Sequence, residues 1–354
     1  MLYHPAMLAH AKFRAILLCL LPLSGCDKLI EAINSGAQAV VEDKTGGLTG
    51  GPKTSDDHLS EKLDAYIKCV NNQSDNVTDS ASRYFGWIAD PKAGPTGKES
   101  PHGLYQIREI KTCVDGINAA ANLEPDDTEI ETAGKAYVDA LTAVEAIANE
   151  AYKYYDEDNF KDDKWVKAKE MHPKLLAAFD AFTAADQVLR TVVATRNDSL
   201  QERDLARVET EMGKILMWHH KKTMLLAKKV MDTGDVALEP VFALDLAKFE
   251  PVLTEFETQL EAMNAYAKDH KEEADSVTSF SSLQSGCEDL KKAAKEMLRR
   301  KRDNKAFTKD DFERFASGPA EWVEGSPPKL SSEYNKLVQT SNGLSYSFYK
   351  PPAK

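Results

Sequence analysis

Apolar residues recur every three or four positions along most of this 354-residue chain, and that spacing limits what it can fold into. On a helix such residues form one stripe, which a neighbouring helix buries. The pattern covers residues 57–87, 130–151, 163–231 and 241–304. The sequence shows no sustained alternation of apolar and polar residues, the pattern that would predict strands. We therefore predict an all-α fold, an elongated bundle of long amphipathic helices.

Interruptions of this pattern predict where the helices begin and end. Residues 90–103 contain three prolines and three glycines and predict the longest loop in the folded body. Pro125, followed by acidic residues, predicts the start of a helix. The pattern over 163–231 is too long for one globular helix, so we expect a break at Pro173 or within residues 195–200.

The first 25 residues have the three parts of an export signal. Lys12 and Arg14 precede about nine apolar residues, whereas a helix needs roughly 20 to cross a bilayer. The closing sequence LSGC resembles the lipobox of bacterial lipoproteins, which implies cleavage before Cys26 and acylation of that residue. Asp27 slightly favours retention at the inner membrane. The alternative is a plain secretory signal followed by an unrelated cysteine.

The predicted mature chain is acidic and tethered. Without residues 1–25 it keeps 43 of its 45 basic residues and all 57 acidic ones, a net charge of −14. Such a surface repels phosphate backbones, so we expect no nucleic-acid partner. Residues 26–57 form the lipidated N-terminus and a glycine-rich tether, 58–343 an all-helical domain, and 344–354 a C-terminal tail.

Three cysteines remain after the lipidated one, in a compartment that we predict to be oxidising. Cys69 and Cys113 lie on the apolar stripes of consecutive predicted helices, which a loop joins. We predict that these two form a disulfide and that Cys287 is a free buried thiol. The alternative is three isolated buried thiols.

Two segments resemble known ligand loops but lack required residues. In "GPTGKES", Lys92 stands where a phosphate loop needs glycine, and Glu99 where it needs serine or threonine. In "DEDNFKDDKWVK", Lys161 and Lys167 occupy the glycine and glutamate positions of a calcium loop. We interpret the second segment as a solvated acidic turn.

Other chemistry-bearing residues give no recognisable site. His219 and His220 are adjacent, so on a helix they point about 100° apart and cannot share a metal ion. We predict no catalytic residue, no metal site and no cofactor. Residues 291–305 carry eight basic and two acidic side chains, which form either a solvated helix end or a contact with anionic lipid headgroups. The residues that we consider as possible ligand contacts are Tyr154, Tyr155, Asp156, Asp158, Trp165 and His172.

Several segments carry a resemblance to a known family. They are "KLDAYIKCVN", "SRYFGWI", "GLYQI", "AYKYYDEDNFKDDKWVKAKEMHPKLLAAFDAF" and "EYNKLVQTSNGL". Together they resemble the YiiG-like lipoproteins, known as domain of unknown function 3829, over roughly residues 58–343. The resemblance implies an all-helical envelope lipoprotein and supports the pairing of Cys69 with Cys113. It implies no established activity and no catalytic residues.

These observations favour a lipid-anchored periplasmic scaffold or protein-interaction module, and not an enzyme. Its expected partners are membrane lipid, through acylated Cys26, and an unidentified envelope protein. The alternative is a small-molecule or ion-binding periplasmic lipoprotein that uses residues 152–165. A bundle that packs Tyr154, Tyr155 and Trp165 into its core favours the scaffold.

Overall fold

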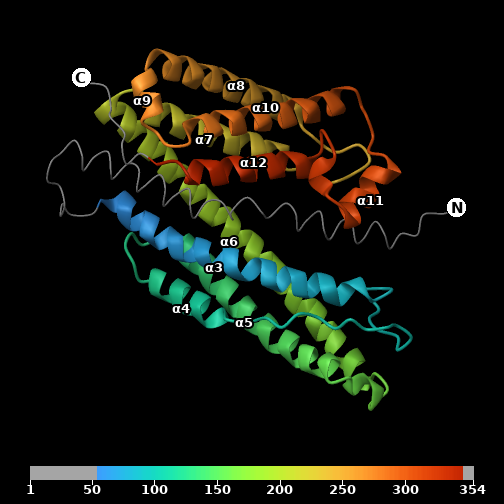
Figure 1. Ribbon diagram of the computed structural model, residues 1–354. Helices are drawn as coiled ribbons and strands as arrows, with labels where there is room; N and C mark the ends of the chain where they lie inside the picture. The colour runs from blue at the N-terminus through green and yellow to red at the C-terminus, as the bar shows by residue number, and fades with distance from the viewer. Residues whose placement is uncertain (1–53, 346–354) are drawn as a thin grey trace. The chain divides into compact units, whose positions relative to one another are not determined.

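The computed structural model describes residues 54–345, and Figure 1 shows that this part of the chain consists mainly of helices. This part of the chain holds ten α-helices and two short 3-10 helices. It contains no strand, and its β contact is an isolated bridge between Thr278 and Ser345. The prediction of an all-α fold is confirmed. Within the same range, no helix is both long enough and apolar enough to cross a bilayer. The predicted signal, Cys26 and nearly all of the tether lie outside the described residues.

The described chain divides into two compact units. Residues up to Asn197 belong to unit 1, and residues from Asp198 onward belong to unit 2. The boundary lies inside helix α6 (Val166–Met212), where the helical pattern of the sequence runs on without a linker. This continuity explains why the sequence suggested one stretch of helical domain over 58–343.

Unit 1 is built from long helices around an aromatic and aliphatic core. Its elements are α3 (Ser55–Gly86), α4 (Ile110–Ala120), α5 (Thr128–Asp156), η2 (Asn159–Lys161) and the first part of α6. Helix α3 packs against α4 and α5. The helices bury one stripe each, and Leu63, Tyr66, Ile67, Tyr137 and Leu141 are fully buried. The 22 residues between α3 and α4 that follow Trp87 form one long loop, residues 88–109, without a helix or strand.

A disulfide joins the first two helices of unit 1. Cys69 on α3 and Cys113 on α4 are bonded, with their Cα atoms 4.6 Å apart, as the sequence predicted. Both residues are buried. The bridge therefore closes the chain segment that contains the long loop.

Unit 2 surrounds helix α7 with further helices. Its elements after α6 are α7 (Leu216–Gly234), α8 (Leu246–Asp269), α9 (Lys271–Asp275), α10 (Phe280–Arg302), α11 (Lys309–Ser317), η3 (Ala320–Trp322) and α12 (Pro327–Asn342). Helix α7 packs against α8, α10 and α12. Phe249, Phe256, Leu283 and Leu337 belong to its buried core, together with Cys287, a free thiol as predicted.

The predicted helix boundaries differ from those of the structure at three places. Pro125 does not start a helix, because α5 begins at Thr128 and the side chain of Asp127 caps it by accepting the N–H of Ile130. Helix α6 runs through Pro173 and residues 195–200 without ending. The break comes instead at Gly213, whose φ of 82° is the left-handed conformation that commonly ends helices at glycine. The predicted helical stretch 241–304 also divides, into α8, α9 and α10.

Candidate functional site

The residues considered as ligand contacts separate into two groups. Tyr154, Tyr155, Trp165 and His172 join an aromatic cluster in unit 1, whereas Asp156 and Asp158 are exposed on the turn after α5. The centroids of neighbouring rings in the aromatic cluster lie 4.9–6.4 Å apart. Its members are Tyr84, Phe85, Trp87, Tyr154, Tyr155, Phe160, Trp165, His172 and Phe179.

His172 links three parts of the aromatic cluster through its two ring nitrogens. Its Nε2 lies 3.0 Å from the carbonyl oxygen of Pro91, and its Nδ1 lies 3.0 Å from the hydroxyl of Tyr84. Because a carbonyl oxygen only accepts, Nε2 carries the proton and Nδ1 accepts from Tyr84. Burial lowers the pKa of His172, so the neutral ring is favoured. The imidazole thus ties the loop and α3 to α6.

The long loop covers the aromatic cluster with glycines. Gly94, Gly97 and Gly103 have φ values of 83°, 94° and 62°. A Cβ on Gly94 would lie 2.5 Å from a ring carbon of His172, so only glycine allows this approach. Equivalent atoms on Gly97 and Gly103 would lie 3.3 Å from Trp165 and Tyr155. The loop backbone therefore packs directly against the rings of the aromatic cluster.

The tyrosines of the cluster are core residues. Tyr154 and Tyr155 are 3% and 6% exposed, and Trp165 is half-buried. Burial raises the pKa of Tyr155, which keeps its hydroxyl neutral. This hydroxyl has no hydrogen-bond partner within residues 54–345. The two tyrosines are packed in the core, as expected of a scaffold, whereas Trp165 is only partly buried, so the arrangement expected of a scaffold is met for two of the three residues.

The acidic turn after α5 does not gather metal ligands. Asp158 pairs with Lys161 at 2.5 Å, and Asp163 accepts a hydrogen bond from Tyr154 at 2.8 Å. The backbone N–H of Lys167 also donates to Asp163, at 3.0 Å. Among the described residues, no group of three or more histidine, cysteine or acidic side chains is placed to hold a metal ion.

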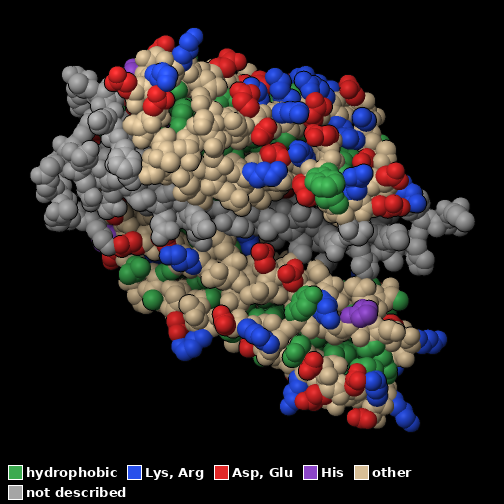
Figure 2. Space-filling view, viewed as in Figure 1, with side chains coloured by type: hydrophobic (Ala, Val, Ile, Leu, Met, Phe, Trp, Pro, Cys, Tyr) green, Lys and Arg blue, Asp and Glu red, His purple; other side chains and the backbone are tan. Residues whose placement is uncertain are grey.

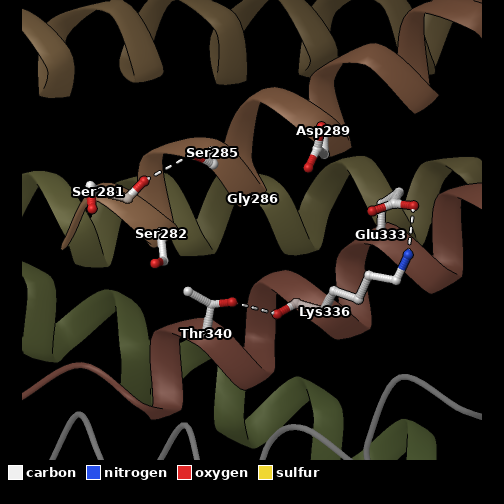
Figure 3. A pocket seen from close by; sticks show the side chains of 8 residues that line it. All are labelled: Ser281, Ser282, Ser285, Gly286, Asp289, Glu333, Lys336 and Thr340. Atoms are coloured by element: carbon white, nitrogen blue, oxygen red, sulfur yellow. Dashed lines mark hydrogen bonds and ion pairs between the residues drawn. The ribbon is translucent and has the colours of Figure 1, made fainter. Parts of the chain in front are cut away.

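Unit 2 has a surface groove that the sequence did not indicate. It lies between α10 and α12, and Figure 3 shows the side chains of both helices along it. Its volume is about 310 Å³. The two helices approach each other closely at Gly286, where an added Cβ would lie only 3.2 Å from Leu337 Cδ1. The lining residues are Ser281, Ser282, Ser285, Gly286, Asp289, Glu333, Lys336 and Thr340.

Most polar groups of the groove are satisfied within it. Ser285 donates to the carbonyl of Ser281 at 3.1 Å, and Thr340 donates to the carbonyl of Lys336 at 2.9 Å (Figure 3). Glu333 accepts from Lys336 at 2.9 Å and from Lys329 at 2.7 Å. Only a serine-rich stretch of the sequence, "FSSLQSG", marked this region, and serines in a helix are common without a ligand.

The two histidines of α7 face different partners. His220 Nε2 lies 2.8 Å from the Ser341 hydroxyl, whereas His219 Nδ1 lies 3.2 Å from the side-chain nitrogen of Gln259. The expectation that they cannot converge on one metal ion therefore matches the structure. Burial, with a smaller contribution from Lys221, lowers the pKa of His220 to about 3.

Half of the eight basic residues in the run at the end of α10 form ion pairs with neighbouring carboxylates. Lys295 pairs with Glu257 at 2.8 Å, and Arg302 pairs with Glu250 at 2.9 Å. Lys301 donates to the carbonyl of Phe242 at 2.8 Å. Figure 2 accordingly shows acidic side chains among the basic ones over α8 and α10. This pairing favours the solvated helix end over a lipid-binding face.

The fold defines an all-helical protein of two units with one disulfide in its described residues. The family model described as "Protein of unknown function (DUF3829)" matches residues 57–343, so the chain belongs to this family. It is 31% identical over 290 residues to the "Uncharacterized protein YiiG" of Escherichia coli (strain K12), a match that covers 81% of this chain and 79% of the relative. No solved structure matches the chain.

Proposed function

We propose that this protein is a lipid-anchored, periplasm-facing helical scaffold or protein-interaction module of a bacterial cell envelope. The observation that carries the proposal is the sequence LSGC after a short apolar run, which would place an acylated Cys26 in membrane lipid. The disulfide between Cys69 and Cys113 supports export, because disulfides persist in oxidising compartments. We assign the protein no catalytic activity, and Asp27 slightly favours the inner membrane.

The packing of unit 1 supports an interaction module over a carrier of small molecules. The predicted ligand region contributes its tyrosines to the core, and loop glycines cover them. The alternative, a small-molecule or ion-binding lipoprotein, would use the open groove between α10 and α12. Asp289 is an exposed carboxylate of this groove. Asp289→Asn should therefore weaken the binding of such a ligand without disturbing the core.

The anchor is tested by replacing the predicted lipid attachment residue. Cys26→Ser should abolish labelling by radioactive palmitate and release the protein from membranes. Cys287→Ala, which removes a buried cysteine far along the chain, is the control and should keep both properties. Membranes are washed in high salt before the protein is detected. A Cys26→Ser variant that stays in the washed membranes would contradict the proposal.

A further inference from the structure

The long loop of unit 1 carries an exposed surface whose cations are not neutralised. We call it the loop surface, and it consists of Arg83, His102, Tyr105, Gln106 and Arg108, all exposed. Neighbouring contacts hold it together. The guanidinium carbon of Arg83 lies 4.6 Å from the centre of the Tyr105 ring, and Arg83 Nε donates to the carbonyl of His102 at 2.8 Å. Arg108 Nε donates to the side chain of Gln106 at 2.8 Å.

The acidic residues of the loop are turned toward its own backbone. Glu99 accepts from the backbone N–H groups of Thr96, Gly97 and Lys98 at 2.9–3.0 Å. Although burial raises its pKa, these hydrogen bonds lower the pKa of Glu99 to about 2. Asp90 accepts from the backbone N–H of Lys92 at 2.9 Å in the same way. Neither carboxylate forms an ion pair with a side chain of the described chain.

The arginines are therefore left with free donors. Within residues 54–345, neither Arg83 nor Arg108 has a carboxylate within 4.0 Å, in contrast to Arg302 on α10. The nearby acidic residues, Asp79 on α3 and Glu109 beside Arg108, are exposed and make no ion pair with them. A guanidinium has five N–H donors, and each of these arginines uses only one or two. The N–H groups that remain free on each guanidinium can donate two parallel hydrogen bonds to one carboxylate.

The loop surface is also rigid. Side chains of the helices fix its backbone: Ser80 donates to the carbonyl of Tyr105 at 2.7 Å, and Trp87 donates to that of Gly103 at 2.9 Å. Asn149 on α5 both accepts from the N–H of Ile107 and donates to its carbonyl, each at 2.9 Å. Binding to a fixed surface costs little ordering entropy. Tyrosine and arginine are also the side chains that most often dominate interface energies.

We infer that the loop surface binds an acidic segment of another envelope protein. This inference rests on the proposed function and names the surface and the chemistry of the partner. Tyr105, which is 51% exposed, supplies an aromatic anchor, and the two arginines pair with carboxylates. The rest of the mature chain has an excess of acidic residues and repels an acidic partner, so the unpaired guanidinium groups of this surface provide a local point of charge complementarity.

Helix α3 separates the loop surface from the first residues that the structure describes. The tether joins α3 at its first residue, and Arg83 lies 28 residues further along the helix. At 1.5 Å per residue this separates the two points by about 42 Å. The loop surface thus lies near the C-terminal end of α3, far from the first residue of that helix.

The test uses the full-length lipoprotein in cells, with a photo-crosslinking amino acid at position 106 and, as controls, at positions 268 and 322. We expect a protein adduct at 106 whose crosslinked peptide has an excess of aspartate and glutamate. Tyr105→Ala and Arg108→Glu should each lower its yield by about tenfold or more. Lys268→Glu and Trp322→Ala, which change exposed side chains of unit 2, should leave it unchanged.

Other outcomes overturn the inference. An adduct at 106 with a lipid or glycan, or with a neutral or basic peptide, would exclude an acidic protein segment. Adducts at 268 or 322 without one at 106 would leave the proposed interaction module standing and remove the loop surface from it. Release of Cys26→Ser from membranes is measured separately, so failure of the anchor is distinguishable. Circular dichroism of each variant establishes that its helices remain folded.

Discussion

At the scale of single residues, buried polar groups do most to specify this structure. Lys62 is fully buried on α3, and its ammonium group donates to the carbonyls of Leu123 and Pro125 at 2.8 and 2.9 Å and to Glu131 at 2.5 Å. The sequence shows Lys62 only as one more lysine of a helix. Its role depends on residues about 60 positions away, which no local pattern contains.

We predict that Lys62→Met destabilises unit 1 by about 2 kcal/mol. Methionine fills a similar volume but leaves the carbonyls of Leu123 and Pro125 without this partly buried donor, and each lost hydrogen bond costs about 1 kcal/mol. Urea unfolding measures the change. Lys135→Met is the matched control, because Lys135 pairs with Asp139 on the surface at 75% exposure, and no measurable change is expected. Equal effects in the two variants would contradict the role of burial.

His220 makes the stability of unit 2 depend on pH. Its pKa is about 3 in the folded state and about 6.5 when unfolded, so the unfolded chain takes up the proton first as pH falls. The stability is therefore fully present above pH 6.5 and is lost below it, at about 1.4 kcal/mol per pH unit. Burial also lowers the pKa of His219, which adds to the same slope in unit 2, and that of His172, which makes the stability of unit 1 depend on pH in the same direction.

We predict that His220→Gln makes the unfolding free energy less dependent on pH between about 6 and 4. Glutamine can still hydrogen-bond Ser341 but takes up no proton, so the slope should fall by the share of one histidine. The measurement is urea unfolding at half-unit pH steps. His102→Gln on the exposed loop is the control and should keep the original slope. An unchanged slope in His220→Gln would show that this histidine is not buried as described.

At the scale of helices, the sequence predicted the presence of each helix better than the residues at which it begins and ends. The stripe of apolar residues located α3, α5 and α8, because burial of one face leaves that pattern directly in the sequence. Pro173 was expected to break α6, yet it lies inside the helix, where tertiary contacts outweigh the loss of one backbone hydrogen bond. The actual break at Gly213 carried a readable signal, a glycine just after the helix.

Gly213 and Gly116 should respond in opposite ways to the same substitution. A Cβ added at either position would have no other group within 4 Å, so the two positions differ in backbone conformation alone. Gly213→Ala should destabilise unit 2 by about 1 kcal/mol, because φ is 82° there. Gly116→Ala, inside α4, should stabilise unit 1 by about 0.5–1 kcal/mol. Thermal melts distinguish the two signs, and stabilisation by both would argue against the left-handed turn at Gly213.

At the scale of the whole molecule, the composition and the spacing of cysteines predicted more than any motif did. Acidic, helix-rich composition and a predicted export signal led us to expect a helical body and a disulfide, and residues 54–345 contain both. The loop surface and the groove between α10 and α12 were not predicted, because each is made by segments that only the fold brings together. The sequence left open whether the aromatic residues around Tyr155 bind a ligand, because aromatic residues pack a core as readily as they bind a ligand.

The compartment and the disulfide can be tested together by counting thiols. After Cys26 the chain has three cysteines, Cys69, Cys113 and Cys287. The proposed export and acylation of Cys26 predict that denaturation of the full-length protein exposes about one reactive thiol per chain, that of Cys287, because Cys69 and Cys113 are bonded. A chain produced from residue 27 onward stays in the reducing cytoplasm and should expose about three. Closure of a loop of 44 residues should also make unit 1 of the exported chain more stable by up to about 4 kcal/mol. Unit 2, which has no disulfide in its described residues, should unfold alike in both preparations. Three thiols in the exported chain, or one in the cytoplasmic chain, would break the connection between export and this bond.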